Sequence, residues 1–234
     1  RQIGYKVINR IKPSGPSSIA TLLLVLFLMS STAWAQGHNG HGHGQGVNTL
    51  KEIPVEELNK SGALPAISIG RPDAAITIIE YASMTCGHCG FFHRDLLPKL
   101  KSKYISTGIA RLVVREFPLE NTAMAVSMLA RCAGHEKTYD VIAAMFDRQR
   151  QWLRRGDVRD DLRGIMSEFG MSKENFDRCM INKELFHQIK AIRQHAMDAF
   201  GVKATPTFFI NGEPLVGPLT IEEFDKIIQP MIKK

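Results

Sequence analysis

The chain has 234 residues, of which 44% are hydrophobic and 23% are charged, and its formal net charge is +7. This length is ample for one sizeable hydrophobic core. The 30 Lys and Arg residues are mostly interleaved with acidic ones, so no basic stripe points to a nucleic-acid partner.

The first 35 residues have the three-part plan of a secretory signal peptide. An apolar run over 19–29 precedes the small-x-small sequence Ala33-Trp34-Ala35. The run is short for a membrane span of about 20 residues, although an uncleaved anchor is the alternative. We expect residues 1–35 to direct export to the periplasm, which leaves about +3 on the remainder. Four basic residues and no acid open the segment: Arg1, Lys6, Arg10 and Lys12.

Residues 36–63 are predicted to be a His- and Gly-rich tether and an N-terminal segment. The tether lacks apolar residues over 37–46, so it cannot build a core. A solvated linker is the interpretation preferred over a loose metal site at His38, His41 and His43. A short surface helix is expected within 52–60.

Over 64–120, the pattern predicts strand, helix and strand. The expected strands are 66–69, 76–81 and 112–117, and a helix follows Cys86 to about residue 103, with Pro98 as a kink. A strand, a crossover helix and a second strand form the unit of a parallel sheet.

Residues 121–200 show almost only helical periodicity, which predicts an inserted all-helical subdomain. The sheet is expected to resume in 201–234. There the turn Asn211-Gly212 joins a strand at 207–210 to a return strand at 214–217. Thr220 and Glu223 form the capping box of a last helix. Within 121–200, helices are expected near 122–133, 138–152 and 159–168, and after the N-caps Ser172 and Asn182.

The sequence Cys86-Gly87-His88-Cys89 carries the chemistry. Two cysteines on one turn at a helix start can close a small disulfide, and the helix N-terminus stabilises the thiolate of Cys86. His88 can add a positive charge or a hydrogen-bond donor, and Cys89 would be the shielded partner. Half of a zinc site has the same spacing. The strand before and the helix after favour a redox pair, and Cys132 and Cys179 supply no second CxxC.

Thr205-Pro206 is the second informative position. A proline just before a strand is a candidate for a cis peptide bond. Such a bond would turn the backbone of Thr205 toward the cysteines, where its N–H and C=O could pair with an extended substrate. The alternative is an ordinary trans proline at a strand start.

Together these features resemble the DsbA-like thiol:disulfide oxidoreductases of the thioredoxin superfamily, over about residues 64–234. The matching segments are 78–83, Cys86 to Cys89, the helical insert, 205–212 and Gly217. The resemblance implies an α/β thioredoxin fold with an inserted helical subdomain. It makes Cys86 the nucleophile, Cys89 the buried partner and Pro206 the cis-proline. Glu80, six residues before Cys86, falls where the family often has a carboxylate that accepts a proton from the buried cysteine; a surface acid at a strand end is the alternative.

One departure concerns the residues between the cysteines. DsbA-like oxidases often carry Pro-His, whereas Gly87-His88 resembles the pair of milder protein disulfide isomerases. A Thr before the cis-proline also occurs in bacterial disulfide isomerases, which are dimers with a separate N-terminal domain. Residues 36–63 are too few and too polar to form one, which favours a monomeric oxidase.

Cys132 and Cys179 both lie on apolar faces of the predicted insert. In an exported protein we expect them to form a structural disulfide, and two buried free cysteines are the alternative.

The sequence therefore predicts an exported oxidoreductase without a cofactor or metal that oxidises dithiols of unfolded or partly folded proteins. Family resemblance adds a membrane-bound partner that re-oxidises it. The alternatives are a disulfide isomerase or reductase, a Cys/His metal-handling protein, and a binding module or chaperone that keeps the fold.

Overall fold

The computed structural model describes residues 50–60, 62, 64–154, 158–217 and 219–232. All of them belong to one compact unit, residues 45–234. The predicted signal peptide, 1–35, and the tether histidines His38, His41 and His43 lie outside the described residues.

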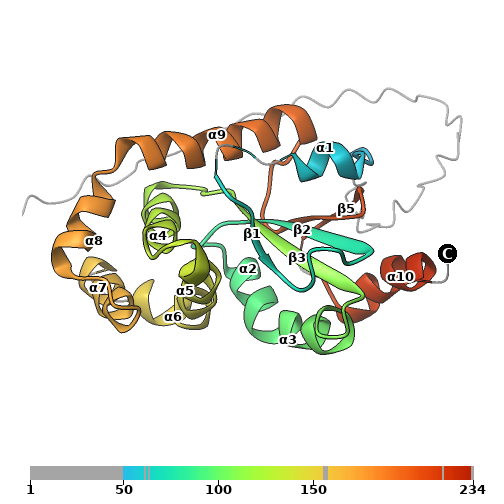
Figure 1. The fold of residues 1–234 in the computed structure, drawn as a ribbon, viewed down its shortest axis with the longest axis horizontal. Coiled ribbons are helices and arrows are strands. Elements are labelled where there is room, and N and C mark those ends of the chain that lie inside the picture. Colours follow the sequence, from blue (N-terminus) through green and yellow to red (C-terminus); the bar gives the residue numbers. More distant parts are fainter. Residues whose placement is uncertain (1–49, 61, 63, 155–157, 218, 233–234) are drawn as a thin grey trace, which may run out of the picture. The chain divides into compact units, whose positions relative to one another are not determined.

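Within these ranges, the core is built on one five-stranded sheet with the order β1-β3-β2-β4-β5 (Figure 1). Strands β2 and β3 are parallel, as the predicted crossover requires, and the other neighbours are antiparallel. The strands are β1 (Ile67–Ile69), β2 (Ile76–Ala82), β3 (Ala110–Glu116), β4 (Thr207–Ile210) and β5 (Glu213–Val216).

The central strand β2 is buried over its whole length, because both faces of the sheet are covered by helices. Successive side chains of a strand point to opposite faces. Ile76 and Ile78 accordingly join the larger hydrophobic cluster, and Ile79 and Tyr81 join a second one on the other face. Glu80 has the parity of Ile78, so its carboxylate lies on the face of the larger cluster.

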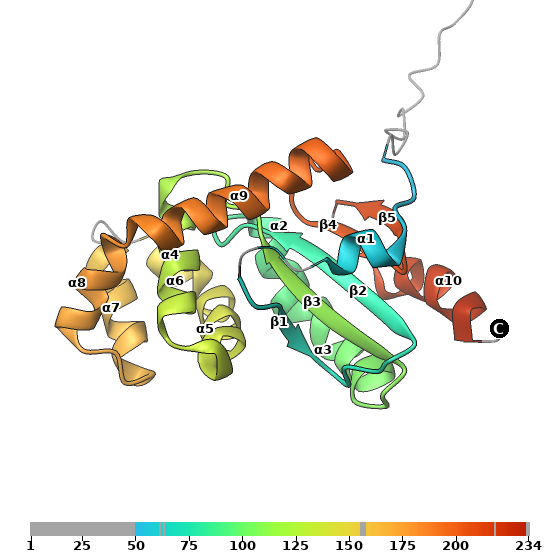
Figure 2. The ribbon, with the colours of Figure 1, turned by 45° about the horizontal axis from the view of Figure 1, so that its top comes forward.

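The larger cluster is covered by the helical run that follows Cys86 and by α10 (Ile221–Ile232). The other face is covered by α1 (Val55–Asn59) and α9 (Lys183–Phe200). Figures 1 and 2 show α1 and α9 on one side of the sheet and α2, α3 and α10 on the other.

The helical run after Cys86 extends to Ile105 and alternates between α-helical and π-helical turns. It consists of α2 (Gly87–Phe91), η1 (Phe92–Leu96), α3 (Leu97–Leu100) and η2 (Lys101–Ile105). Pro98 lies in α3, between the two π-helical stretches, where a proline removes one helical hydrogen bond. The wider turn of η1 buries the consecutive residues Phe92 and His93 together.

Between β3 and β4 the described residues form helices and no strand. This confirms the predicted α/β fold class with an all-helical insertion. The helices are α4 (Asn121–Cys132), α5 (His135–Asp147), α6 (Gln149–Trp152), α7 (Val158–Glu168), α8 (Lys173–Met180) and α9.

The single helix expected over 138–152 is in fact two helices, because the chain leaves the helical conformation at Arg148. Arg148 has φ −94° and ψ 10°, and α6 begins at Gln149. The Arg148 guanidinium pairs with the carboxylate of Glu168 on α7 at 2.5 and 2.7 Å. The spacing of apolar residues in the sequence carries no information about this tertiary contact.

Local signals at several element ends were predicted correctly. Ser172 and Asn182 cap α8 and α9 through their side chains. Thr220 and Glu223 exchange hydrogen bonds of 2.7 and 3.3 Å, which is the expected capping box. Asn211 and Gly212 both have positive φ, 46° and 97°, as a two-residue hairpin turn requires.

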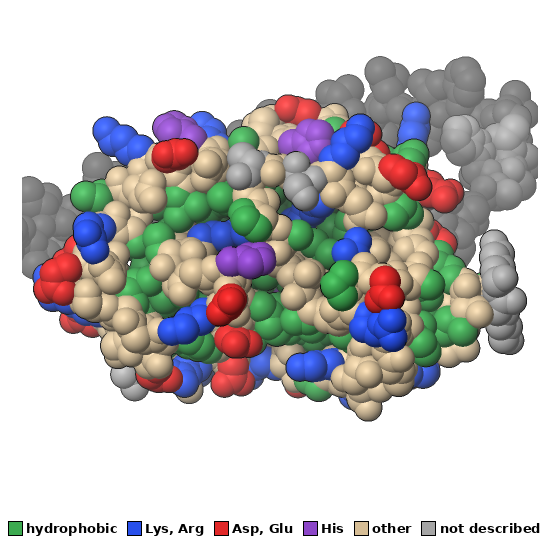
Figure 3. All heavy atoms as spheres, in the orientation of Figure 1, with side chains coloured by type: hydrophobic (Ala, Val, Ile, Leu, Met, Phe, Trp, Pro, Cys, Tyr) green, Lys and Arg blue, Asp and Glu red, His purple; other side chains and the backbone are tan. Residues whose placement is uncertain are grey.

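The described surface shows mixed charge. On the face drawn in Figure 3, Lys and Arg side chains are interspersed with Asp and Glu. Among the described residues, no helix combines the length and the apolar character that crossing a membrane requires.

A disulfide joins Cys132, at the end of α4, to Cys179 on α8, and it spans 47 residues of sequence. Cys179 is buried and Cys132 is exposed. The bond therefore ties together two helices of the insertion that are distant in sequence.

Removing this crosslink is expected to lower the stability of the protein without unfolding it. The chain-entropy model assigns about 4 kcal/mol to a loop of this length, and measured losses are typically about 2–4 kcal/mol. Urea unfolding of Cys132→Ala/Cys179→Ala, compared with the wild type, measures the loss. Mass spectrometry without reductant, on a Cys86→Ala/Cys89→Ala chain, supplies the control. Free thiols at Cys132 and Cys179 in protein isolated oxidised would contradict the assignment.

Candidate active site

Cys86 lies where β2 ends and the helical run begins, and it is the N-cap residue of α2. Its Sγ accepts a hydrogen bond from the backbone N–H of Cys89 at 3.4 Å. Across the site, the Cys86 thiol donates to the carbonyl oxygen of Thr205 at 3.2 Å. The side chain is half-buried and so stays accessible to another thiol.

The environment of Cys86 lowers the pKa of its thiol to about 5. The largest cause is a hydrogen bond from the Cys89 side chain, which outweighs the opposing effect of partial burial. The backbone N–H groups of Cys89 and His88 add to the stabilisation of the thiolate. Cys86 is therefore mostly thiolate at neutral pH, and the thiolate is the nucleophilic form.

Cys89 has the opposite environment. Its side chain is completely buried, and burial raises the pKa of this thiol far above its usual range. The hydrogen bond to Cys86 and the charge of Glu80 raise it further. Both cysteines are free thiols in the structure. The pair therefore consists of one reactive sulfur near the surface and one protonated sulfur beneath it.

Glu80 lies below the cysteines and is completely buried. One carboxylate oxygen, Oε2, is 2.8 Å from Nε2 of His93 on η1, and the other, Oε1, has no hydrogen-bond partner. The His93 ring stacks on Phe146 of α5, with centroids 4.1 Å apart. The alternative of a surface acid at a strand end is wrong, because Glu80 is enclosed by the helical run and the insertion.

Thr205 and Pro206 face the cysteines from the other side of the site. Their peptide bond is cis, and the Pro206 carbonyl accepts a hydrogen bond from the N–H of Gly217 at 3.1 Å. The Thr205 hydroxyl is buried without a partner. The structure thus brings Cys86, Cys89, Glu80, Thr205 and Pro206 together, as the sequence predicted.

Gly87 and His88 are exposed at the start of α2. A Cβ atom added at Gly87 would meet no atom within 4 Å, so a larger residue fits there. His88 contributes its backbone N–H to the stabilisation of the Cys86 thiolate.

Two residues at the site were missed by sequence reasoning. His93 belongs to a helical pattern in which a buried histidine looks like any polar residue. Gln149, which is 2% exposed, donates to the carbonyl oxygens of Met84 and Cys86. No sequence signal links a glutamine of a distant helix to the CxxC loop; only tertiary structure shows it.

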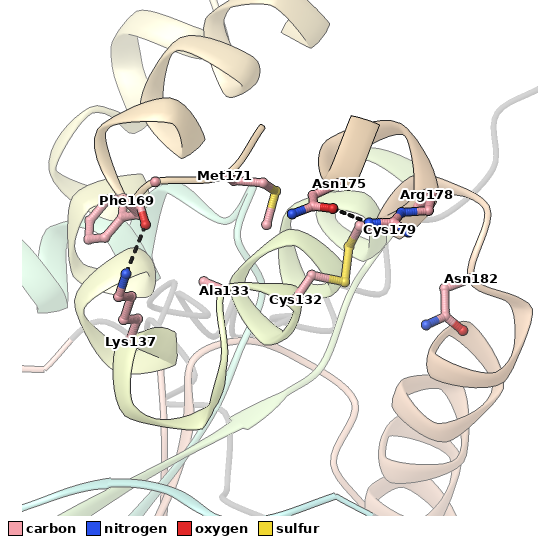
Figure 4. Close-up of a pocket in the computed structure, with 10 residues that line it drawn as sticks. Cys132, Ala133, Lys137, Phe169, Met171, Asn175, Arg178, Cys179 and Asn182 are labelled. Atoms are coloured by element: carbon pink, nitrogen blue, oxygen red, sulfur yellow. Dashed lines mark hydrogen bonds between the residues drawn. A yellow bond between two sulfur atoms is a disulfide. The ribbon is translucent and has the colours of Figure 1, made fainter. Parts of the chain in front are cut away.

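A cavity of about 380 Å³ lies away from the cysteine pair, beside the Cys132–Cys179 disulfide (Figure 4). Its polar walls are already engaged, since Lys137 donates to the carbonyl of Phe169 and Arg178 donates to Asn175. In the described part of the chain, no group of three or more His, Cys, Asp or Glu residues is arranged to hold a metal ion.

Comparisons with known proteins agree on one family. The sequence model of the family described as thioredoxin matches residues 63–230. A Rickettsia conorii protein, whose name describes a protein-disulfide oxidoreductase, is 28% identical over 68% of this chain. The chain covers 62% of that relative, which is less than two thirds of its length. Disulfide bond formation protein D of Bacillus subtilis is 23% identical, over 70% of this chain and 76% of its own.

Among solved structures, alpha-DsbA1 of Wolbachia pipientis superposes with a TM-score of 0.67 and 30% sequence identity. The match covers 75% of this chain and 94% of that one.

The reduced protein is expected to show a thiol that titrates near pH 5 instead of near 9. The rate at which iodoacetamide alkylates Cys86 should rise with a midpoint near that value, and Cys86→Ser should lose this phase.

Since the pKa of Cys86 is lower in the folded protein than in the unfolded chain, Cys86 contributes stability that grows as pH rises from about 5 to about 9. That contribution disappears as pH falls through 5. An alkylation midpoint near pH 8 or 9 would contradict the contacts assigned to Cys86.

Proposed function

The chain belongs to the thioredoxin family, in its DsbA-like branch, and on that premise we propose that it introduces disulfide bonds into other proteins through Cys86 and Cys89. The observation that carries the proposal is the asymmetry of the pair. A stabilised thiolate at Cys86 sits above a buried Cys89 whose pKa is raised. This is the arrangement that thiol–disulfide exchange in one preferred order requires.

The reaction begins from the oxidised pair. A substrate thiolate attacks Sγ of Cys86, the Cys86–Cys89 bond breaks, and Cys89 leaves with the bonding electrons and takes up a proton. A second substrate thiolate then attacks the substrate sulfur of the mixed disulfide, and Cys86 leaves as a thiolate. The substrate has gained a disulfide, and the enzyme has gained two electrons and a proton on Cys89.

The direction follows from the stability of the leaving group. Stabilising the Cys86 thiolate favours the reduced enzyme, so its disulfide is a stronger oxidant than one between ordinary thiols. We propose export to the periplasm as the setting, where disulfides persist. Re-oxidation by a membrane-bound partner is proposed from the DsbA-like resemblance.

The substrate is proposed to be an unfolded or partly folded protein with free cysteines. The backbone of Thr205 lies beside Cys86, next to the cis-proline, where an extended chain can pair with it. Phe91 follows the cysteines on α2 and is 44% exposed. Leu119, whose N–H binds Ser83 Oγ of the active-site loop, is 48% exposed. These apolar side chains suit an unfolded polypeptide better than a small polar thiol.

Disulfide isomerisation is the second candidate, and the Gly87-His88 pair together with Thr205 before the cis-proline favours it. Isomerisation needs the reduced enzyme and only the outer thiol for the first attack. A Cys89→Ala chain that still rearranges scrambled disulfides would favour the isomerase, whereas an oxidase loses its net activity.

The oxidised protein is expected to form disulfides in a reduced, unfolded model protein, and Cys86→Ala should abolish this activity. Equilibration with glutathione should give a potential above about −230 mV, on the oxidising side of thioredoxin at about −270 mV. Cys132→Ala/Cys179→Ala is the control that should keep the activity. A potential in the thioredoxin range, or unchanged activity in Cys86→Ala, would rule out the oxidase.

Glu80→Gln is expected to slow closure of the Cys86–Cys89 disulfide by about tenfold or more, because Cys89 must give up its proton before it attacks. Oxidation of the reduced protein by glutathione disulfide, followed across pH, measures this rate. Asp95→Asn, an exposed acid on the same helical run, is the matched control. An unchanged rate and pH profile in a folded Glu80→Gln protein would remove Glu80 from the mechanism.

A further inference from the structure

Gln149 connects the helical insertion to the loop that carries the nucleophile. It is the first residue of α6, immediately after the chain leaves helical conformation at Arg148, and its side chain is 2% exposed. The amide Nε2 donates two hydrogen bonds, to the carbonyl oxygen of Met84 at 2.8 Å and to that of Cys86 at 2.9 Å. One neutral side chain thus holds both sides of the turn that presents Cys86.

These two carbonyl groups lie where β2 has ended and the helical run has just begun. The Met84 residue is buried, and its carbonyl has no strand to pair with. The Cys86 carbonyl also accepts the N–H of Gly90, at 3.0 Å, as the first hydrogen bond of the helical run. A buried carbonyl that loses its donor is destabilised, so the loop would rearrange if the amide were removed.

Gly90 shows how closely the glutamine fits against this turn. A Cβ atom at Gly90 would lie 2.1 Å from Oε1 of Gln149 and 2.7 Å from Nη1 of Arg94. The amide therefore occupies the space that any side chain at residue 90 would need. Gln149 belongs to the insertion itself, and Arg94 is tied to the insertion because its Nη1 donates to the carbonyl of Phe146 at 3.0 Å.

The short helix that carries Gln149 is itself anchored. Trp152 is completely buried, and its Nε1 donates to the carbonyl of Met145 on α5 at 2.8 Å. Arg148 pairs with Glu168 on α7. The glutamine is thereby presented by a helix that is packed against α5 and paired with α7.

We propose that Gln149 is a positioning residue that sets the stability of the Cys86 thiolate, and hence the thiol–disulfide equilibrium, by fixing the turn from Met84 to Gly90. The inference deepens the proposed function and rests on it. The thiolate depends on directed backbone contacts within this turn: the N–H of Cys89 lies 3.4 Å from Sγ, and the N–H of His88 adds to its stabilisation. Rotation of the turn weakens both contacts together, because hydrogen bonds depend steeply on angle.

The first test replaces the amide by an apolar group of similar length. Gln149→Met should raise the pKa of Cys86 in the reduced protein and lower its equilibrium constant for oxidising glutathione by about three- to tenfold. A tenfold change corresponds to about 30 mV for this two-electron couple. Gln151→Met is the matched control, since Gln151 lies on the same short helix and is exposed. It should leave both quantities unchanged.

The second test displaces the amide and keeps Gln149 itself. Gly90→Ala puts a methyl group 2.1 Å from the present position of Oε1, so the amide must move and its two hydrogen bonds weaken. The pKa and the equilibrium constant should shift in the same direction as in Gln149→Met. The double variant should shift no further, whereas independent effects would multiply. This route holds if Gln149→Met fails to fold.

The outcomes separate a positioning role from general stabilisation. General loss of stability would lower the unfolding midpoint of the reduced and oxidised forms equally and leave the Cys86 pKa unchanged, and that result overturns the proposal. An equal shift in Gln151→Met also overturns it. If the wild type oxidises no protein substrate while the pKa still responds to Gln149 and Gly90, the positioning role stands and the oxidase function fails.

Discussion

The site depends on one physical contrast, two sulfur atoms a single helical turn apart in opposite electrostatic environments. Cys86 meets N–H donors at the start of the helical run, and Cys89 is enclosed by the larger hydrophobic cluster. The first environment favours a negative sulfur and the second forbids one. A sheet that is covered on both faces makes this contrast possible, because the fully buried strand β2 places a layer of buried side chains beneath the start of the helical run.

Much of the fold could be predicted because its signals are local. Alternation, caps and the Asn211-Gly212 turn each act within a few residues, and the strands and most helix ends follow from them. The break at Arg148 could not be predicted, because tertiary contacts there, such as the ion pair with Glu168, leave no trace in the spacing of apolar residues. The π-helical turns beside Pro98 were missed as well, since a proline predicts an irregular helix but does not specify a π-helical turn.

The site shows the same division. Cys86, Cys89 and Pro206 are marked by residue type and spacing. His93 and Gln149 are ordinary polar residues whose partners, Glu80 and the Met84 and Cys86 carbonyls, lie far away in sequence. The parity of β2 does place Glu80 on the face below the cysteines, so its burial follows from alternation once the strand is known. The burial of His93, the partner of Glu80, does not follow from such a pattern, because η1 departs from the ordinary helical repeat.

Helix α9 has a consequence for the way the protein comes apart. Leu185 and Ile189 near its beginning belong to the larger cluster, and Ala196 and Phe200 near its end belong to the cluster on the other face of the sheet. Disrupting either cluster exposes part of the same helix, α9. Sheet and insertion are therefore coupled in their opening, and amide protons of both should exchange with solvent through shared, large-scale fluctuations.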